Sequence, residues 1–189
     1  ALTFVLFWPL LHAVFGLLLA VVVVVHKWVF VGRLTAGVVD VIGGWGHTCF
    51  FFSSHILRLL DIVFLAFWRG TVVMSLFYKA MGADVALSAR LHSPLFAVDF
   101  DTLSIGPGAY LGPSVEYQCH SFVTFALRHG WIRVGRDSVL LGSSVLIPSS
   151  TFEDETVMEP GSLIMAHIPV RKGSTVQGNP ALECHHRLA

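Results

Sequence analysis

The sequence predicts a membrane α-helical hairpin followed by an all-β domain that is a parallel β-helix. Of its 189 residues 54% are hydrophobic and only 13% are charged, which is too apolar for an ordinary soluble domain. Few formal charges lie in the first 81 residues, whereas a six-residue repeat begins at Met81. We therefore expect the hairpin and an amphipathic connector in residues 1–80, the β-helix in residues 81–183 and a tail in residues 184–189.

The first predicted helix covers residues 2–25, a run without any formal charge. A helix of this length can cross about 30 Å of hydrocarbon. A cleaved signal peptide is the alternative, but the apolar run is long for one and no small-residue cleavage site follows it. We expect a transmembrane helix, so membrane lipid is an expected partner and the protein is predicted to be integral to a membrane, although the sequence does not identify which.

The second predicted helix covers residues 47–68, which are also numerous enough to span. Arg58 and Asp61 are three residues apart, so on a helix they share a face and can partly neutralise each other. A helix that lies in the membrane interface remains the alternative. Paired glycines and Asp40 interrupt the apolar pattern of residues 36–46, which we interpret as the turn of the hairpin.

The repeat that begins at Met81 has a period of six residues, which fits neither a helix nor an alternating strand. An aliphatic residue opens each unit and Gly, Ser or Pro follows; the openers are Met81, Leu87, Ile105, Leu111, Leu141 and Ile147. After Ile147 the frame slips by one residue, so that later units start at Phe152 and Met158. This period is typical of a parallel β-helix, and the number of hexads predicts about four to five coils. A Gly-rich all-β domain with accidental spacing is the alternative.

One segment, between Tyr117 and Val134, leaves the six-residue frame. It begins with His120 and ends near Arg128 and His129. Imidazole has a pKa suited to removing a proton from an amine or hydroxyl near neutral pH. The segment therefore predicts a loop over a site, with His120 as the candidate catalytic residue and Arg128 and His129 as candidate substrate-binding residues. A turn histidine that caps backbone groups is the alternative for His120.

Other classes of function find less support. The formal net charge is zero and no basic run is interleaved with aromatics, so we expect no nucleic-acid partner. The cysteines Cys49, Cys119 and Cys184 are widely spaced and odd in number, which argues against a disulfide framework or a zinc knuckle. Cys119 is not a convincing nucleophile with His120 as its base, because adjacent residues on a strand point to opposite faces. No metal site is predicted.

Several motifs resemble a known superfamily. "CHSF" at 119–122 and the hexads from residue 132 to "GNPA" at 178–181 resemble the hexapeptide-repeat acyltransferases. Membrane helices leading into "GADV", "LSIGPGAYLG", "HSF" and "GNPA" resemble more closely the C-terminal membrane and β-helix region of nonribosomal-peptide-synthetase-like epsilon-poly-lysine synthetases. The sequence departs from the family pattern at Cys119, where relatives often have Gly, and at Pro148, Glu153 and Glu159, which replace turn glycines.

The resemblance implies that the β-helix is left-handed. It also implies a membrane-anchored acyl or aminoacyl transferase, which moves the group from a thioester to an amine or hydroxyl with His120 as general base. The donor would be carrier-protein phosphopantetheine or a coenzyme A thioester, with no tightly bound cofactor. Such prisms pack in threes, so the partners would be copies of the chain or tandem β-helix units, a carrier protein or a larger membrane complex. The alternative is a catalytically inactive β-helix subunit that serves as a structural component of such a complex.

Overall fold

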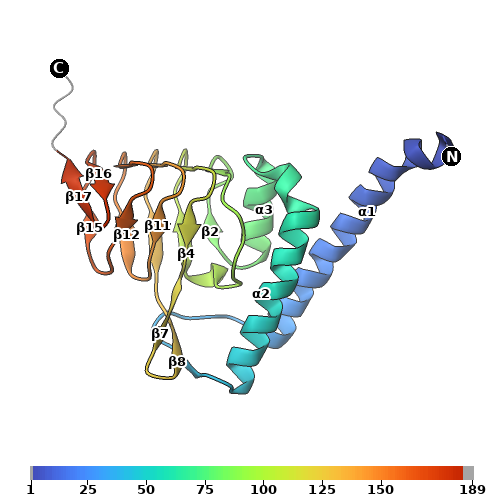
Figure 1. The fold of residues 1–189 in the computed structure, drawn as a ribbon, viewed down its shortest axis with the longest axis horizontal. Coiled ribbons are helices and arrows are strands. Elements are labelled where there is room, and N and C mark those ends of the chain that lie inside the picture. The colour runs from blue at the N-terminus through green and yellow to red at the C-terminus, as the bar shows by residue number, and fades with distance from the viewer. Residues whose placement is uncertain (1, 185–189) are drawn as a thin grey trace.

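The computed structural model of the protein describes residues 2–184, which form a helical part at the N-terminal end and a stack of short strands (Figure 1). Helix α1 (Leu2–His26) continues as a π-helical turn, η1 (Lys27–Val31). Helix α2 (Trp45–Val63) is followed by the 3₁₀ turn η2 (Leu65–Trp68) and helix α3 (Val72–Ala80). Residues 185–189, most of the predicted tail, lie outside the described residues, while Cys184 ends the last strand.

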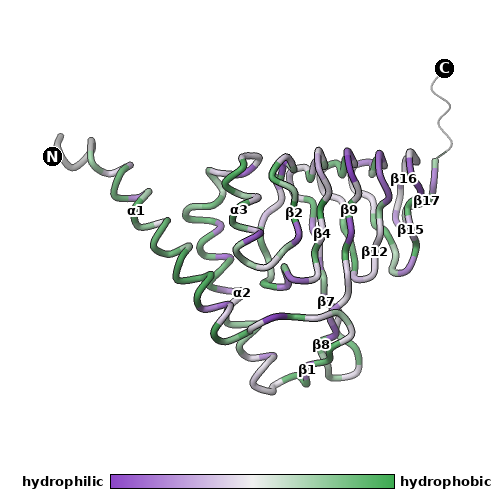
Figure 2. The backbone as a smooth tube through the Cα atoms, turned by 180° about the vertical axis from the view of Figure 1, so that it is seen from behind, coloured by the Kyte–Doolittle hydropathy of each residue, from purple (hydrophilic) through white to green (hydrophobic). Residues whose placement is uncertain are grey.

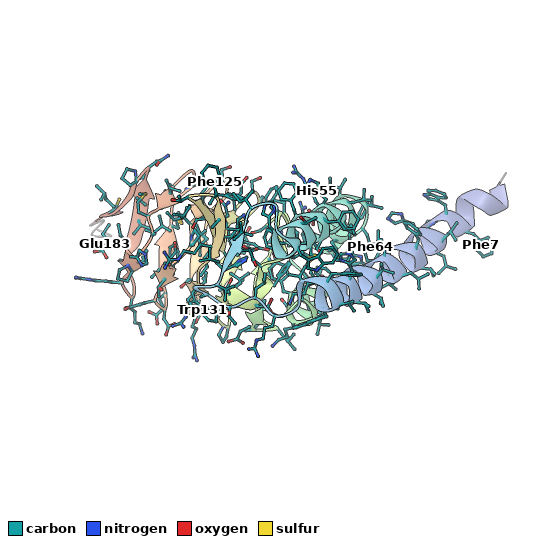
Figure 3. All side chains as sticks on the ribbon, turned by 90° about the horizontal axis from the view of Figure 1, so that it is seen from below. Phe7, His55, Phe64, Phe125, Trp131 and Glu183 are labelled. Carbon is teal, nitrogen blue, oxygen red and sulfur yellow. The ribbon has the colours of Figure 1, made fainter. Side chains whose placement is uncertain are left out.

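Helix α1 contacts the rest of the protein along only part of its length. It lies against α2 at Gly16, where a Cβ atom would come within 2.0 Å of the Phe64 ring. Figure 3 shows Phe64 between the two helices and Phe7 far out on α1. Most side chains of the outer part, such as Leu10, Leu11, Leu17 and Leu18, are exposed apolar groups. Hydrophobic residues dominate α1, whereas the strands carry hydrophilic residues at intervals (Figure 2).

Among the described residues, one helix is long and apolar enough to cross a membrane, and it covers Phe7–Val31. The predicted second span, residues 47–68, is not a helix of that kind and stays a prediction. Seven of the 19 residues of α2 are buried in the protein, with Leu57 and Leu60 fully covered. The predicted neutralisation of Asp61 by Arg58 is wrong: Asp61 pairs with Arg69, and the Arg58 guanidinium lies over the Phe96 ring at 5.4 Å.

The strands wind in turn through three parallel sheets, so the predicted parallel β-helix is confirmed. The sheets have the orders β2-β4-β9-β12-β15, β3-β5-β10-β13-β16 and β6-β11-β14, and β17 closes the second sheet antiparallel to β16. The bounds are β2 Asp84–Val85, β3 Arg90–Leu91, β4 Leu103–Ile105, β5 Tyr110–Leu111, β6 Glu116–Tyr117, β9 Ile132–Val134, β10 Val139–Leu140, β11 Val145–Leu146, β12 Ser150–Phe152, β13 Val157–Met158, β14 Leu163–Ile164, β15 Pro169–Val170, β16 Thr175–Gly178 and β17 Ala181–Cys184.

The core of the β-helix is a set of buried side chains that recurs every sixth residue. From the third coil onward it comprises Val134, Leu140, Leu146, Phe152, Met158, Ile164, Val170 and Val176. The predicted openers Leu141 and Ile147 are wrong, because the residues just before them face inward. Leu87 is exposed as well. At 140–141 and at 146–147 two aliphatic residues are adjacent, so the sequence does not show which of the two faces inward. The one-residue slip of the frame lies before Val134 rather than after Ile147.

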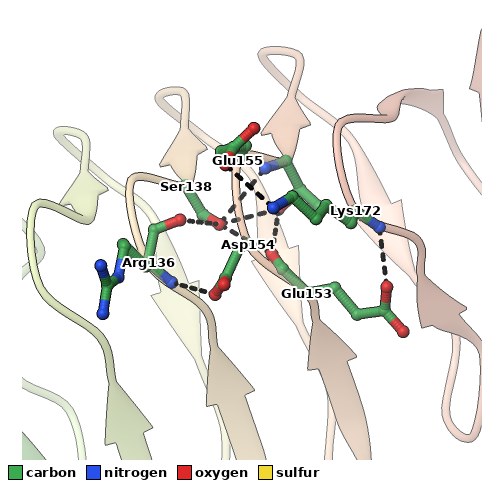
Figure 4. Close-up of polar contacts among 7 residues, drawn as sticks. Arg136, Ser138, Glu153, Asp154, Glu155 and Lys172 are labelled. Carbon is green, nitrogen blue, oxygen red and sulfur yellow. Dashed lines mark hydrogen bonds and ion pairs between the residues drawn. The ribbon is translucent and has the colours of Figure 1, made fainter.

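The turns of the β-helix also follow the six-residue period. A residue with positive φ lies in most of the turns from the second coil onward: Gly108, Ser114, Asp137, Ser143, Ser149, Glu155, Gly161, His167 and Gly173. The sequence predicts Glu153 and Glu159 at turn positions that glycine usually holds. In the structure Glu155 and Gly161 have the positive φ of these turns. Glu153 and Asp154 instead bind neighbouring coils, where their carboxylates accept the N–H groups of Lys172 and Arg136 (Figure 4).

Replacing Ser143 by glycine is expected to stabilise the β-helix by about 0.5–1 kcal/mol. Relief of the left-handed conformation exceeds the extra entropy that glycine gives the unfolded chain. Chemical unfolding followed by circular dichroism in detergent measures the change. The matched control is Ser144→Gly, because the Ser144 hydroxyl is buried and donates to the Glu159 carbonyl at 3.0 Å. This control should lose about 1 kcal/mol. Equal shifts in both variants would contradict the interpretation.

Candidate functional site

A β-hairpin interrupts the coils between β6 and β9 and carries the candidate site. Its strands are β7 (His120–Val123) and β8 (Ala126–His129), and it projects to one side of the stack (Figure 1). The pairing register places His120 directly opposite His129. The segment that sequence reasoning singled out therefore brings two of its three candidate residues together, at the base of the hairpin.

The hairpin has a third strand that comes from the helical part of the chain. This strand, β1 (Val39–Val41), lies in the connection between α1 and α2 and pairs antiparallel with β8. The sequence predicts only a turn in this connection, whereas residues 39–41 of it form a strand. Because Asp40 lies on β1, the pairing brings its carboxylate to 3.6 Å from His129 Nε2.

His120 is oriented by a buried carboxylate. Its Nδ1 atom lies 2.7 Å from Asp99 Oδ2, and Asp99 is 1% exposed. Asp99 directly precedes the 3₁₀ turn η3 (Phe100–Thr102). An ionised Asp99 accepts the hydrogen bond from Nδ1–H, so Nε2 is the unprotonated nitrogen of the ring. Gln118 Nε2 lies 3.2 Å from His120 Nε2 and donates to it. The ring is thus held in the tautomer that can take a proton at Nε2.

His129 is buried behind His120, with 1% of its surface exposed. Burial lowers its pKa, against the opposing effects of Asp99 and Asp40. The Phe50 ring of α2 makes edge contacts with both histidines, at centroid distances of 5.2 Å to His120 and 5.5 Å to His129. The substrate-binding role of His129 stays a prediction, and its burial favours a supporting role as a neutral ring.

The buried His129 gives the fold an expected pH dependence. Because its pKa in the folded protein is lowered from 6.5, the unfolded chain binds more protons, and stability falls as the pH drops below about 6.5. Thermal unfolding at pH 7.5 and pH 5.5 should show a larger loss for the wild type than for His129→Gln. His92→Gln is the control, since His92 belongs to the β-helix rather than to the hairpin, and its ring contacts Tyr110. If both variants kept the full pH dependence, His129 would not be its source.

An open cavity of about 480 Å³ lies between the hairpin and the wall of the β-helix. This volume lies within the range of small-molecule sites. The hairpin and its flanks contribute His120, Arg128 and His129, while the wall contributes Trp131, Ser149 and His167, together with neighbouring backbone. Arg128 is exposed on the opposite face of β8 from His129, as strand alternation requires. Its role in substrate binding stays a prediction.

Cys119 is fully buried, next to His120 in sequence but on the opposite side of the chain. Burial raises the pKa of its thiol well above the ordinary value. It is therefore unsuited to act as a nucleophile, as the sequence indicates. Across residues 2–184, no cluster of three or more His, Cys, Asp or Glu side chains is placed to hold a metal ion.

Comparisons with known proteins find a curated protein of similar sequence and several solved structures that match part of the chain. No family model matches the chain. Over 171 residues it is 25% identical to a delta-poly-L-ornithine synthetase of Acinetobacter baumannii, a match that covers 88% of this chain and 12% of that protein. The chain is similar to part of a synthetase. It spans about an eighth of the length of this curated relative.

Several solved structures of acetyltransferases match part of the chain. One from Vibrio cholerae matches with a TM-score of 0.49 and 16% identity, over 71% of this chain and 88% of that chain. A maltose O-acetyltransferase from Clostridium difficile 630 matches with a TM-score of 0.45 and 12% identity, over 58% and 72% of the two chains. A complex of the Vibrio protein with acetyl coenzyme A matches with a TM-score of 0.45 and 14% identity, over 72% and 86%.

Sequence reasoning missed three residues of the site: Asp99, Asp40 and Phe50. A signal existed for Asp99, because the inward residues Leu91 and Ile105 are fourteen positions apart rather than twelve. That second interruption holds the acidic pair Asp99 and Asp101. Asp40 and Phe50 lie in the helical part, and no local pattern connects them to the hairpin.

Proposed function

We propose that this chain is a membrane-anchored acyl or aminoacyl transferase domain in which His120 is the general base. The observation that carries the proposal is the hydrogen bond from His120 Nδ1 to the buried Asp99 carboxylate, at the edge of a cavity. A carboxylate that fixes a histidine tautomer is a recurrent arrangement in proton transfer. Arg128 and His129 would bind or support the substrate at the same cavity.

The reaction would proceed by attack on a thioester. The amine or hydroxyl of the acceptor gives its proton to His120 Nε2 as its nitrogen or oxygen forms a bond with the carbonyl carbon. Asp99 stabilises the resulting imidazolium. The carbon–sulfur bond then breaks, and His120 returns the proton to the leaving sulfur, which departs as a thiol. Acyl group, electrons and proton are thereby balanced without another reagent.

The donor would be a coenzyme A thioester or a carrier-bound phosphopantetheine thioester. The Vibrio cholerae acetyltransferase complex with acetyl coenzyme A supports the first possibility. The name of the Acinetobacter synthetase supports an aminoacyl group, since poly-ornithine is built by joining amino acids. In either case the donor is a substrate and not a tightly held cofactor.

The anchor would be α1, alone or with the predicted second span, which would make the protein integral to a membrane. The run Phe7–Val31 supports this by length and composition. We further propose a left-handed β-helix and a threefold arrangement of copies or tandem units, on the resemblance to hexapeptide-repeat acyltransferases. The domain division at residue 81 is part of the same proposal. The second candidate function, an inactive assembly subunit, is favoured by the unusual non-glycine residues in the left-handed turns.

A donor assay separates the two candidates. Membranes that contain the chain are incubated with radiolabelled acetyl coenzyme A or with ornithinyl-pantetheine, and label transferred to amine and hydroxyl acceptors is counted. Transfer from either thioester above the level of membranes without the chain supports the transferase. Absence of transfer from both donors, with stable association of the chain with other integral membrane proteins, would support the assembly subunit.

A further inference from the structure

A second cavity meets His120 from the side of α2. Its volume is about 230 Å³, and it is lined by Phe50, Phe51, Ser54, His55, Arg58, Phe96, Ala97, His120 and Phe122. The Phe50 and Phe122 rings contact the His120 ring edge-on, at 5.2 Å and 5.8 Å between centroids. His120 therefore lines both cavities, which differ in character: the larger one faces the β-helix, and this one is walled by aromatic rings and a helix.

One formal charge lies at this aromatic cavity, that of Arg58. Its guanidinium rests over the Phe96 ring at 5.4 Å and is exposed. Among the described residues it has no carboxylate within ion-pair distance, whereas Arg69, on the same helical part, is paired with Asp61. A guanidinium without an ionic partner beside apolar walls suits an anionic group of a ligand, phosphate above all.

The outer surface of α2 continues the apolar character of the cavity. Phe51, His55, Arg58 and Ile62 follow one another at helical spacing and are all exposed. Phe52 and Leu59 beside them are exposed as well. Because the cavity volume is below the usual range for enclosing a whole ligand, it has room for the head of an amphiphile whose hydrocarbon lies outside, along this surface. Helix α1, the helix long enough to span, packs against α2 along part of its length.

We infer that the second cavity binds the head group of a phosphate-bearing lipid and is the entrance by which a lipid acceptor reaches His120. The inference rests on the proposed transfer function and names its acceptor class. The thioester would occupy the larger cavity. A hydroxyl or amine of the lipid head would lose its proton to His120 Nε2 and form the ester or amide, while the carbon–sulfur bond breaks and the thiol leaves.

The test is photocrosslinking in nanodiscs of phosphatidylcholine that contain a phosphatidylglycerol analogue with a photoreactive head group. Crosslinks are expected on the residues of the cavity. Arg58→Gln should weaken this labelling about tenfold to a hundredfold, as expected for the loss of a charge-assisted hydrogen bond of about 1.5–3 kcal/mol. Arg33→Gln is the matched control, because Arg33 is an exposed cation of the helical part that does not line the cavity.

Competition distinguishes a lipid from free phosphate. Soluble glycerol phosphate should compete only weakly, since it lacks the hydrocarbon that α2 contacts. Equal loss of labelling in both arginine variants, crosslinks spread evenly along α1 and α2, or full competition by glycerol phosphate would each overturn the inference. Crosslinking needs no acyl donor, so its failure would overturn the lipid site alone, whereas failure of the donor assay would overturn the transfer function.

Discussion

Replacing His120 by alanine is expected to lower the transfer rate by roughly 10²- to 10⁴-fold, the usual contribution of a positioned general base. The structure gives the reason: Asp99 holds Nδ1, so that Nε2 is the nitrogen that can take the acceptor's proton, and the ring lines the cavity. The residual rate should come from binding of the two substrates alone. Radiolabel transfer in membranes, at saturating concentrations of both substrates, measures the change.

Two controls separate chemistry from folding. His92→Ala removes an imidazole that lies tilted against Tyr110 in the β-helix and lines none of the cavities at His120. It should keep the wild-type rate. Added imidazole should partly restore transfer to His120→Ala, because a small base can enter the space that the ring leaves. A wild-type rate in His120→Ala would show that this ring is not the base.

Replacing Asp99 by asparagine is expected to lower kcat by about tenfold to a hundredfold with little change in KM. Asparagine can still accept the Nδ1 proton but carries no charge to stabilise the imidazolium, and a hydrogen bond to a charged group is worth about 1.5–3 kcal/mol. The loss should fall on kcat, because Asp99 contacts the His120 ring rather than the substrate. In the proposed mechanism Asp99 is a positioning residue, and the separation of kcat from KM is its specific readout.

The control for Asp99 is Asp84→Asn, which alters a carboxylate of the first coil that accepts only the Ser104 hydroxyl, at 3.4 Å. This variant should leave kcat and KM unchanged. If Asp99→Asn lowered the melting temperature and raised KM along with the loss in kcat, its carboxylate would serve the fold rather than the proton transfer. Thermal unfolding of both variants provides that comparison.

The repeat and its interruption could be predicted from sequence because both are local patterns. A six-residue period with small residues between aliphatics describes a β-helix coil whatever lies around it, and a histidine at the break predicts a site there. The inward frame could not be fixed near Leu140 and Leu146, since an aliphatic residue follows each of them directly. Strand alternation in three dimensions, not composition, decides which of the two side chains enters the core.

The partners of His120 could not be predicted because they come from distant parts of the chain. Asp99 belongs to the preceding coil, and Phe50 and Asp40 belong to the helical part. Each reaches the hairpin only through the packing of the helices against the first coils. Arg58 shows the same limit, since its helical neighbour Asp61 pairs with Arg69 and leaves the guanidinium at the second cavity.

The pairing of β1 with the hairpin has a consequence for the order of folding. Coils of a β-helix can add one after another on their neighbours, so most of the stack needs only contacts that are close in sequence. The register pairs Val39, which precedes the first two coils in the sequence, with Arg128, which follows them. Closing so long a loop costs entropy that is recovered only when both ends are in place. The coils can therefore be complete before β1 joins the hairpin, and the candidate site is assembled only when the first and middle segments of the chain meet.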